Sequence, residues 1–493
     1  MKIQPMALVI AAACAALSGC GGGRSSTPSS TPSTGGNTGA NTPVTYAVGG
    51  SVSGLLSGET VQLLNNGGDP LTVNADGSFT FATQLAAGSP YNVTIGTQPG
   101  GASCSVSASS GTIAGTVSNV AVTCSPMLLK NIALFLDSAA GTILTYAYDA
   151  ASGQLTPLAG PDLSAGAGSN GILVDASATH AYTLTPGNGT GAAPRLAAFT
   201  IGLGGVLTAN GVQTLTSDAL DATLDVAGDT LYVLQAPVKV GQAATIMTYP
   251  IDPSSGAVGA QVGTATVLPS TADLLYRSPV ADYLYAIAAD AGSTGLGDDS
   301  VTAYGIGTNG ASTTGQPKPV GTAVATGIGP TAMAITPDGK YAYILNNNDR
   351  TVSIYTVGTD GSLTALGAGS PFAVPLGTAS PAAPQLTAMA IDPSGQYLYI
   401  NDIANGDIYQ LKIDSNNGTL TALGTPPVAL GTPNAGINMV GDSTGATLYA
   451  FDRNGGGVSV WTQNASTGQL SPARLSSFTF PTGTAVSTNA FGK

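Results

Sequence analysis

The sequence predicts an all-β protein, a seven-bladed β-propeller preceded by a small Ig-like β-sandwich. Charged residues make up only 8% of the 493 residues, against about 25% in an average protein, and glutamate occurs once, at Glu59. Short runs of alternating apolar and polar residues recur between turn residues. From residue 126 onward, a unit of about 50 residues repeats, which is a period typical of propeller blades.

The chain is acidic and poor in histidine. Lys and Arg total 13 against 26 for Asp and Glu, so the formal net charge is −13. Nucleic acids and anionic lipid headgroups need a cationic face, so neither is expected as the main partner. His180 is the single histidine, which excludes a histidine metal cluster and a two-histidine mechanism.

Residues 1–20 are predicted to be a lipoprotein signal peptide. The apolar run from Met6 to Leu17 is shorter than the roughly 20 residues that span a bilayer. The ending Leu17-Ser18-Gly19-Cys20 resembles the lipobox of bacterial lipoproteins, in which the cysteine becomes the lipidated first residue. Gly21 favours sorting to the outer membrane. The expected location is therefore the cell envelope, with the lipid anchor as the only membrane contact; an ordinary signal peptide with an incidental cysteine is the alternative.

Residues 21–45 are predicted to be a disordered tether. The segment contains mostly Gly, Ser, Thr and Pro, and it cannot bury enough apolar surface to fold. As a flexible coil it would reach about 25–30 Å.

Residues 46–125 are predicted to form the sandwich, from six or seven short strands. Asp76-Gly77 is predicted to turn a hairpin between LTVNA and SFTFA. Cys104 and Cys124 form an even pair in an exported chain, so a disulfide is expected, with a redox pair as the less favoured alternative. The segment resembles carboxypeptidase-regulatory-like and Ig-like modules, which implies a spacer or an adhesion module.

Residues 126–493 are predicted to form seven blades of four strands. Two columns of large residues recur on the second and third strand of each unit, and they are expected to fill the gaps between blades. A Gly begins the fourth strand each time, as in GSLTAL and GTLTAL. The first unit lacks an obvious first strand, and the tail at 484–492 is expected to supply it and close the ring. The first column contains Phe135, Tyr182, Tyr232, Tyr285, Tyr343, Tyr399 and Tyr449. The second contains Tyr146, Phe199, Tyr249, Tyr304, Tyr355, Leu411 and Trp461.

The fifth and sixth units carry a family resemblance. AITPDGKYAYILNN with TVSIYTV and GSLTAL, and AIDPSGQYLYIN with GTLTAL, resemble the seven-bladed lactonase family, which includes 6-phosphogluconolactonase-like propellers. The resemblance covers the propeller only. It implies the fold and lactone-ring chemistry, but no catalytic motif of the family can be matched residue by residue.

Polar residues are expected to gather at one mouth of the propeller, where first strands begin and second strands end. One interpretation is that they form Asx turns that satisfy loop amides. The other is an oxygen-rich rim that binds a sugar or a cation, so that a structural calcium ion remains an option although no cofactor is expected. The rim contains Asn170, Asp221, Asp273, Thr331, Gln385, Asp137, Asn346, Asn401, Asp402 and Asp452.

Arg277 interrupts an apolar column. The equivalent positions in other units are Val174, Leu224, Ile335 and Ile391, and a charge there is costly unless it is paired. A register shift, or an ion pair with Asp273 or Asp282, is one explanation. The other is a pocket facing the axis, in which Arg277 holds an anionic or carbonyl oxygen. His180, at the opposite end of its unit from the mouth, is expected to be an exposed hairpin residue.

The leading functional hypothesis is an envelope lipoprotein whose propeller binds or scaffolds a protein, glycan or small molecule at its mouth. The ligand-binding candidates are Asn170, Asp221, Asp273, Arg277, Asn346 and Asp452. The alternative is an enzyme that hydrolyses or isomerises an uncharged lactone, with Arg277 stabilising an oxyanion and an aspartate such as Asp273 acting as base. Scarcity of cations weighs against a phosphorylated substrate.

Overall fold

The computed structural model describes residues 43–493 with internal gaps. The gaps are 128–130, 138–139, 149–152, 159–162, 167, 188–192, 238–242, 269–271, 290–298, 307–314, 377–382, 425–426, 430–435, 443–444, 452–456, 473–477, 480–485 and 493. The predicted signal peptide, the tether up to residue 42, Cys20 and Asp452 therefore lie outside the described residues. Within the described part, no helix is long and apolar enough to cross a membrane.

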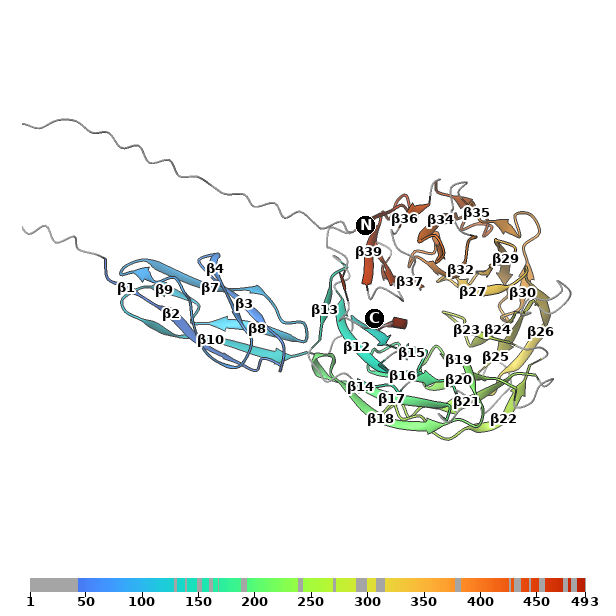
Figure 1. The fold of residues 1–493 in the computed structure, drawn as a ribbon, viewed down its shortest axis with the longest axis horizontal. Helices are drawn as coiled ribbons and strands as arrows, with labels where there is room; N and C mark the ends of the chain where they lie inside the picture. The colour runs from blue at the N-terminus through green and yellow to red at the C-terminus, as the bar shows by residue number, and fades with distance from the viewer. Residues whose placement is uncertain are drawn as a thin grey trace, which may run out of the picture. The chain divides into compact units, whose positions relative to one another are not determined.

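The N-terminal strands form two four-stranded sheets and a two-stranded one (Figure 1). The sheet orders are β5-β2-β10-β8 and β4-β3-β7-β9, with β1 paired to β6, and β10 runs parallel to β2. In β3, Val61, Leu63 and Asn65 are buried and alternate with half-buried neighbours, the period expected of strands with one face on a core. The strands are β1 Thr45–Tyr46, β2 Val48–Ser53, β3 Val61–Asn65, β4 Gly68–Val73, β5 Gly77–Thr80, β6 Leu85–Ala86, β7 Pro90–Thr97, β8 Ala102–Ser107, β9 Ser110–Thr112 and β10 Val117–Pro126.

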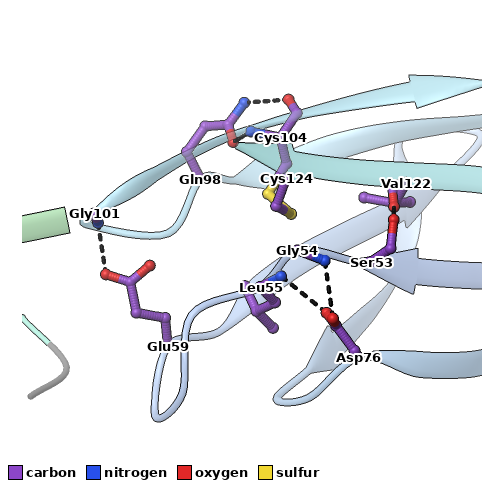
Figure 2. The surroundings of a disulfide bond; sticks show 10 residues. All are labelled: Ser53, Gly54, Leu55, Glu59, Asp76, Gln98, Gly101, Cys104, Val122 and Cys124. Atoms are coloured by element: carbon purple, nitrogen blue, oxygen red, sulfur yellow. Dashed lines mark hydrogen bonds between the residues drawn. A yellow bond between two sulfur atoms is a disulfide. The ribbon is translucent and has the colours of Figure 1, made fainter. Parts of the chain in front are cut away.

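Cys104 and Cys124 form the expected disulfide, which joins directly opposite residues of the neighbouring strands β8 and β10 (Figure 2). The Gln98 side chain forms hydrogen bonds with both backbone groups of Cys104. Its side-chain oxygen accepts a hydrogen bond from the Cys104 amide at 2.8 Å, and its side-chain nitrogen donates one to the Cys104 carbonyl at 2.9 Å. The predicted cysteine pairing is confirmed.

The hairpin predicted at Asp76-Gly77 is wrong. The strands on either side of it lie in different sheets, because β4 pairs with β3 and β5 pairs with β2. The Asp76 carboxylate instead accepts hydrogen bonds from the amides of Gly54 and Leu55, at 2.9 and 2.8 Å (Figure 2). An Asp-Gly pair predicts a turn, but it does not predict whether the strands on either side of the turn pair with each other.

Among the described residues the propeller strands form seven sheets, three of four strands and four of five strands. We number the sheets as blades 1–7 in chain order. The first strands of blades 2–7, β15, β19, β23, β27, β32 and β37, lie nearest the axis (Figure 1). Blade 1 has β11 Ile132–Asp137, β12 Thr142–Tyr148, β13 Leu155–Pro157 and the added β14 Leu163–Ser164. Blade 2 has β15 Gly171–Val174, β16 His180–Thr185, β17 Arg195–Ile201 and β18 Leu207–Thr214, with the short 3-10 helix η1 Leu203–Gly205. Blade 3 has β19 Ala219–Leu224, β20 Thr230–Gln235, β21 Thr245–Pro250 and β22 Val262–Val267. Blade 4 has β23 Leu274–Arg277, β24 Tyr283–Ala288, β25 Ser300–Gly305 and β26 Lys318–Ala325.

The remaining blades repeat this order. Blade 5 has β27 Pro330–Ile335, β28 Tyr341–Asn346, β29 Thr351–Val357, β30 Leu363–Ala365 and the added β31 Phe372–Ala373. Blade 6 has β32 Leu386–Ile391, β33 Tyr397–Asp402, β34 Asp407–Ile413, β35 Leu420–Ala422 and the added β36 Val428–Ala429. Blade 7 has β37 Gly436–Asp442, β38 Gly445–Phe451, β39 Gly457–Gln463, β40 Leu470–Pro472 and the added β41 Phe478–Thr479.

The C-terminal strand β42, Val486–Gly492, closes the ring as the sequence predicts. It pairs antiparallel with β11, from Ile132 opposite Gly492 to Asp137 opposite Val486, and so becomes the innermost strand of blade 1. The first and last parts of the propeller sequence therefore share one sheet, and the ring leaves no open end between blades 7 and 1.

Five tyrosines of the first aromatic column, in blades 3–7, each link their blade to the following one. Tyr399 is fully buried, and its hydroxyl donates a hydrogen bond to the Gly468 carbonyl of the following blade at 2.6 Å. Gly468 has a positive φ of 71°, and a Cβ there would lie 2.1 Å from the ring of Tyr397. Glycine is therefore required at this position. The same bond recurs from Tyr232 to Gly315, Tyr285 to Gly361, Tyr343 to Gly418 and Tyr449 to Gly153, the last joining blade 7 to blade 1.

Tyr182 is the exception among the column tyrosines. Its ring is buried between blades 2 and 3 like the others, but its hydroxyl is buried without a hydrogen-bond partner among the described residues. The gap between blades 2 and 3 thus lacks the hydroxyl-to-carbonyl bond that joins the later blades.

We predict that Tyr399→Phe and Tyr182→Phe will differ in stability. Tyr399→Phe removes a made hydrogen bond and leaves a buried carbonyl without its partner, which should cost about 1–2 kcal/mol of unfolding free energy. Tyr182→Phe removes a hydroxyl that has no partner, so the cost should be near zero. Denaturant unfolding of both variants measures this, and equal losses would contradict the assignment.

Candidate functional site

Most of the predicted rim residues at the second-strand ends are used by the propeller itself. Asn346 is fully buried; its side-chain oxygen accepts a hydrogen bond from the Gly327 amide, and its nitrogen donates to Ser353 at 2.9 Å. Asp402 is also fully buried and accepts hydrogen bonds from the amides of Gln385 and Ala404. These geometries match the Asx-turn interpretation, and they leave Asn346 no free group to offer a ligand.

Other rim residues connect loops or neighbouring blades in the same way. Asp137 is 5% exposed and accepts a hydrogen bond from the Ala140 amide. Thr331 donates to the Leu386 carbonyl in the next blade at 2.8 Å. Asn401 is fully buried. None of these side chains therefore stands open at the mouth.

Asp221 differs from the rest of the rim in its electrostatics. It lies on β19, the innermost strand of blade 3, and is half-buried. Its two carboxylate oxygens accept hydrogen bonds from the amides of Ala222 and of Leu275 in blade 4, each at 2.8 Å. Burial raises the pKa of Asp221 to about 6, although both hydrogen bonds act in the opposite direction. At neutral pH Asp221 is therefore mainly ionised, but it accepts a proton more readily than an ordinary aspartate does. This combination suits a general base.

Asn170 and Asp221 line the same cavity. This cavity, which we call the blade 2–3 cavity, has a volume of about 190 Å³. Asn170 is exposed just before β15, whereas Asp221 comes from the neighbouring innermost strand. The other lining residues are Gly171, Ile172, Leu173, Tyr182, Thr183, Leu184, Leu196, Ala222 and Leu231.

Two further hydroxyl-bearing residues line the blade 2–3 cavity. Tyr182 and Thr183 are each 1% exposed, and both hydroxyls are buried without a hydrogen-bond partner in the described part of the chain. Buried unpartnered hydroxyls are uncommon, because each costs the hydration it has lost. The sequence placed Tyr182 only in the packing column, and nothing in its periodicity marks the missing partner.

Arg277 and Asp273 do not form a catalytic pair. They lie at opposite ends of β23, and four residues of extended chain span about 13 Å. Both side chains are exposed. Loss of hydration raises the pKa of Asp273 and lowers that of Arg277, and in Arg277 the Asp225 carboxylate opposes the shift. One lactone ring could not contact both groups at once.

The predicted ion pair of Arg277 is also wrong. His180 pairs with Asp175 and Lys340 with Asp338, but no ion pair of Arg277 is present among the described residues. Arg277 therefore pairs with neither Asp273 nor Asp282. The carboxylate of Asp225 in blade 3 acts electrostatically on Arg277, and an influence from the neighbouring blade cannot be deduced from residue spacing within one blade.

His180 is not the exposed hairpin residue that was predicted. Its side chain is 12% exposed, and its ring Nδ1 lies 3.2 Å from the Asp175 carboxylate. Gly256 of blade 3 packs against the ring, since a Cβ there would lie 2.0 Å from His180 Cδ2. Burial acts to raise the pKa of Asp175, but hydrogen bonds from Ser177, Thr179 and the His180 amide outweigh it, so the pKa is lowered. Blade 3 covers the imidazole of His180. The sequence pattern within blade 2 could not predict this contact, because it comes from another blade.

A second cavity, of about 420 Å³, is lined mainly by residues in and after the innermost strands of blades 5 and 6, and all but one of its lining residues are Ala, Ile, Met or Pro. Its one titratable side chain is Asp392, which is 2% exposed and accepts hydrogen bonds from the amides of Gln396 and Tyr397. This cavity therefore offers no free acid or base. Within the described residues, no group of three or more His, Cys, Asp or Glu side chains is placed to hold a metal ion, and the calcium option stays a prediction.

A family model described as "Lactonase, 7-bladed beta-propeller" matches residues 132–488, well over half of the chain. Among curated proteins, a 6-phosphogluconolactonase of Pectobacterium atrosepticum is 29% identical over 150 residues. This alignment covers 30% of the present chain and 42% of the relative, so the chain spans less than half the length of that protein.

Solved structures share the fold. A periplasmic gluconolactonase of Pseudomonas aeruginosa superposes with a TM-score of 0.58 at 18% identity, over 74% of this chain and 99% of that one. A protein of Lactobacillus plantarum superposes with a TM-score of 0.55 at 16% identity, over 73% and 99%. At such identities the comparison establishes the propeller fold alone.

We predict that Asp221→Asn changes the pH dependence of stability. The folded pKa of about 6 lies above the ordinary value of 3.8, so the folded state binds the proton more tightly and wild-type stability falls as pH rises from 4 to 6. Asparagine removes this loss. The unfolding free energy of Asp221→Asn, relative to wild type, should therefore increase by about 2–3 kcal/mol between pH 4 and pH 7. A difference that does not vary with pH would contradict the raised pKa.

Proposed function

The chain belongs to the family of seven-bladed β-propeller lactonases, and we propose that it hydrolyses a lactone in the blade 2–3 cavity with Asp221 as the general base. One observation carries the assignment of the site. Asp221 is the rim residue that combines a cavity beside it with a pKa raised by burial to about 6. Perturbed carboxylates in concave sites are typical of catalytic residues.

The proposed reaction adds one water molecule across the ring ester. Asp221 accepts a proton from water, and the resulting hydroxide adds to the carbonyl carbon. The ring carbon–oxygen bond then breaks, and the leaving alkoxide takes the proton back from Asp221, which yields the hydroxy acid. Each carboxylate oxygen of Asp221 accepts one backbone hydrogen bond and keeps a second lone pair free for the water.

Asn170 is the proposed partner of the substrate carbonyl. Its exposed side chain lines the same cavity as Asp221, and its amide nitrogen can donate a hydrogen bond to the carbonyl oxygen as negative charge develops there. Arg277, at the far end of the neighbouring blade's first strand, has no part in this proposal.

The substrate we propose is uncharged. The residues that line the blade 2–3 cavity include no Lys or Arg, and Asp221 is the one carboxylic acid among them. A phosphate group would be repelled by this carboxylate without a cation to compensate. The family match supports lactone hydrolysis better than the alternative of a pure binding module, which remains the expectation if no lactone is turned over.

We predict that Asp221→Asn lowers kcat/KM for lactone hydrolysis by at least a hundredfold, because general-base catalysis contributes about 10²–10⁴-fold. Acid release from an uncharged lactone, followed with a pH indicator, measures this. Wild-type activity should fall below about pH 6, where Asp221 becomes protonated. The control is Asp360→Asn, the same change in a surface turn of blade 5, which should leave the rate unchanged. Equal rates for Asp221→Asn and wild type would exclude Asp221 as the base.

We also propose that the protein acts in the cell envelope, held by a lipid on Cys20. The basis is the sequence Leu17-Ser18-Gly19-Cys20 followed by a Gly/Ser-rich segment. Expressed with its native leader, the protein should sediment with membranes, and its first residue should be an acylated cysteine by mass spectrometry. Cys20→Ala should release it into the soluble fraction or leave the leader uncut. Wild-type protein that begins at another residue would contradict the anchor.

A further inference from the structure

The second cavity lies toward the opposite end of the first strands from Asp221. Asp221 is near the beginning of β19, whereas the second cavity is lined mainly by the last residues of β27 and β32 and by the hairpins that follow them. We call it the blade 5–6 cavity. It shares no lining residue with the blade 2–3 cavity. A ligand bound there would therefore be independent of the proposed lactonase function.

Prolines form part of the wall of the blade 5–6 cavity. Three successive blades have a proline two residues after the end of the first strand, Pro279, Pro337 and Pro393, and all three line the cavity. Blades 2 and 3 have Ala176 and Val226 at this position. Proline restricts the backbone to a narrow range of φ, so this wall has little freedom to collapse into the cavity.

Neighbouring hairpins also hold one another in place. A Cβ on Gly339 of blade 5 would lie 2.4 Å from Val280 of blade 4, and a Cβ on Gly395 of blade 6 would lie 3.1 Å from Pro337 of blade 5. Each of these hairpins therefore packs closely on a glycine of the next one. The cavity is formed without a ligand, which avoids the ordering cost that a collapsed site would have.

The side chains that line the blade 5–6 cavity leave open space between them. Ile335, Met389 and Ile391 are half-buried, so part of each remains accessible to solvent or to a ligand. The volume of about 420 Å³ is well above that of an engineered cavity of about 150 Å³ that holds benzene. It has room for an alkyl group of roughly eight to twelve carbons. Asp392 is the one charged residue of the lining, and its carboxylate already accepts hydrogen bonds from two amides of its own hairpin.

A polar cavity adjoins the apolar one. It has a volume of about 300 Å³, and the exposed Pro337 lines both. Gln396 and Ser415 line it from blade 6, are exposed, and form no side-chain hydrogen bond within the described part of the chain. Asp338 lines it too, but its charge is compensated by Lys340, whose Nζ lies 2.9 Å from the carboxylate. The polar cavity therefore offers neutral groups that both donate and accept hydrogen bonds. Its other lining residues are Thr336, Tyr341, Ser394, Gly395 and Ile413.

We infer that the two cavities together bind an uncharged amphiphile. Its alkyl group lies in the blade 5–6 cavity, and its hydroxylated head group reaches across Pro337 to Gln396 and Ser415. A free acid is not expected, because the residues that line the blade 5–6 cavity include no Lys, Arg or His, and the one charge among them is the Asp392 carboxylate. A hydroxylated head group suits an amide and a hydroxyl side chain, because all three both donate and accept hydrogen bonds. A glycoside of a medium-length alcohol has this chemistry.

The test is isothermal titration calorimetry with octyl glucoside, below the concentration at which it forms micelles, and with three related compounds. Methyl glucoside has the head group alone, octanol has the chain with one hydroxyl, and octanoate has the chain with an anionic head. Each methylene removed from water strengthens binding about fourfold, so methyl glucoside should bind about a hundredfold more weakly than octyl glucoside, or weaker still. Octanol and octanoate should each bind about 3- to 10-fold more weakly, because they lose hydrogen bonds of the head group.

Matched variants locate the two halves of the ligand. Ile335→Ala truncates the apolar wall and should weaken the binding of octyl glucoside about 5- to 10-fold. Its control is Val174→Ala, at the equivalent half-buried position of blade 2, which should leave the affinity unchanged. Gln396→Ala should weaken octyl glucoside about 3- to 10-fold and octanol much less. Its control is Gln261→Ala, at an exposed glutamine of blade 3, which should change neither.

Thermal unfolding confirms that each variant is folded. If Ile335→Ala is not, Ala390→Leu, which places a larger side chain inside the blade 5–6 cavity, should weaken octyl glucoside in its place. Failure of octyl glucoside to bind the wild-type protein would overturn the inference. Methyl glucoside or octanoate that binds as tightly as octyl glucoside would also overturn it, and so would an equal loss of affinity in Ile335→Ala and Val174→Ala.

Discussion

The contact between neighbouring blades is the constraint on which the propeller depends. Each blade is a small sheet of four or five strands that cannot bury both faces alone, so its stability comes from the gap it shares with the next blade. In five of the seven gaps, a buried tyrosine hydroxyl donates a hydrogen bond to the carbonyl of a glycine with positive φ, as between Tyr343 and Gly418. The bond from Tyr449 to Gly153 and the pairing of β42 with β11 extend the same contacts around the closed ring.

A ring held by repeated contacts can accommodate a gap that differs from the others. Between blades 2 and 3, the Tyr182 hydroxyl has no glycine carbonyl as partner, and a cavity lies beside Asp221. His180 packs on Gly256 there, where Tyr397 of blade 6 packs on Gly468. The other gaps supply the stability that this one gives up, which is the usual relation between a functional site and its scaffold. The burial that makes the charge of Asp221 unfavourable is also what would make it a useful base.

The fold was predictable from the sequence because each blade is built mainly from consecutive strands and the same residue pattern recurs in each unit. The second-strand aromatics recur in every unit and mark seven blades, and the missing first strand of blade 1 predicts the role of β42. The prediction fails where contacts cross between sheets. Asp76-Gly77 connects two sheets instead of forming a hairpin, and Arg277 is influenced electrostatically by Asp225 of another blade instead of pairing with Asp273. For the site, the sequence identified Asn170 and Asp221 as candidates, but their common cavity and the unpartnered Tyr182 hydroxyl depend on how two blades pack.

The most direct test of this account is a crystal structure of the protein with a γ-lactam, an unreactive analogue of a γ-lactone. The account predicts that the lactam ring occupies the space between Asn170, Asp221 and Leu196, with its carbonyl oxygen within hydrogen-bond distance of the Asn170 amide and a water molecule between Asp221 and the carbonyl carbon. A lactam bound instead in the apolar cavity along blades 5 and 6, beside Ile335 and Ile391, would contradict it.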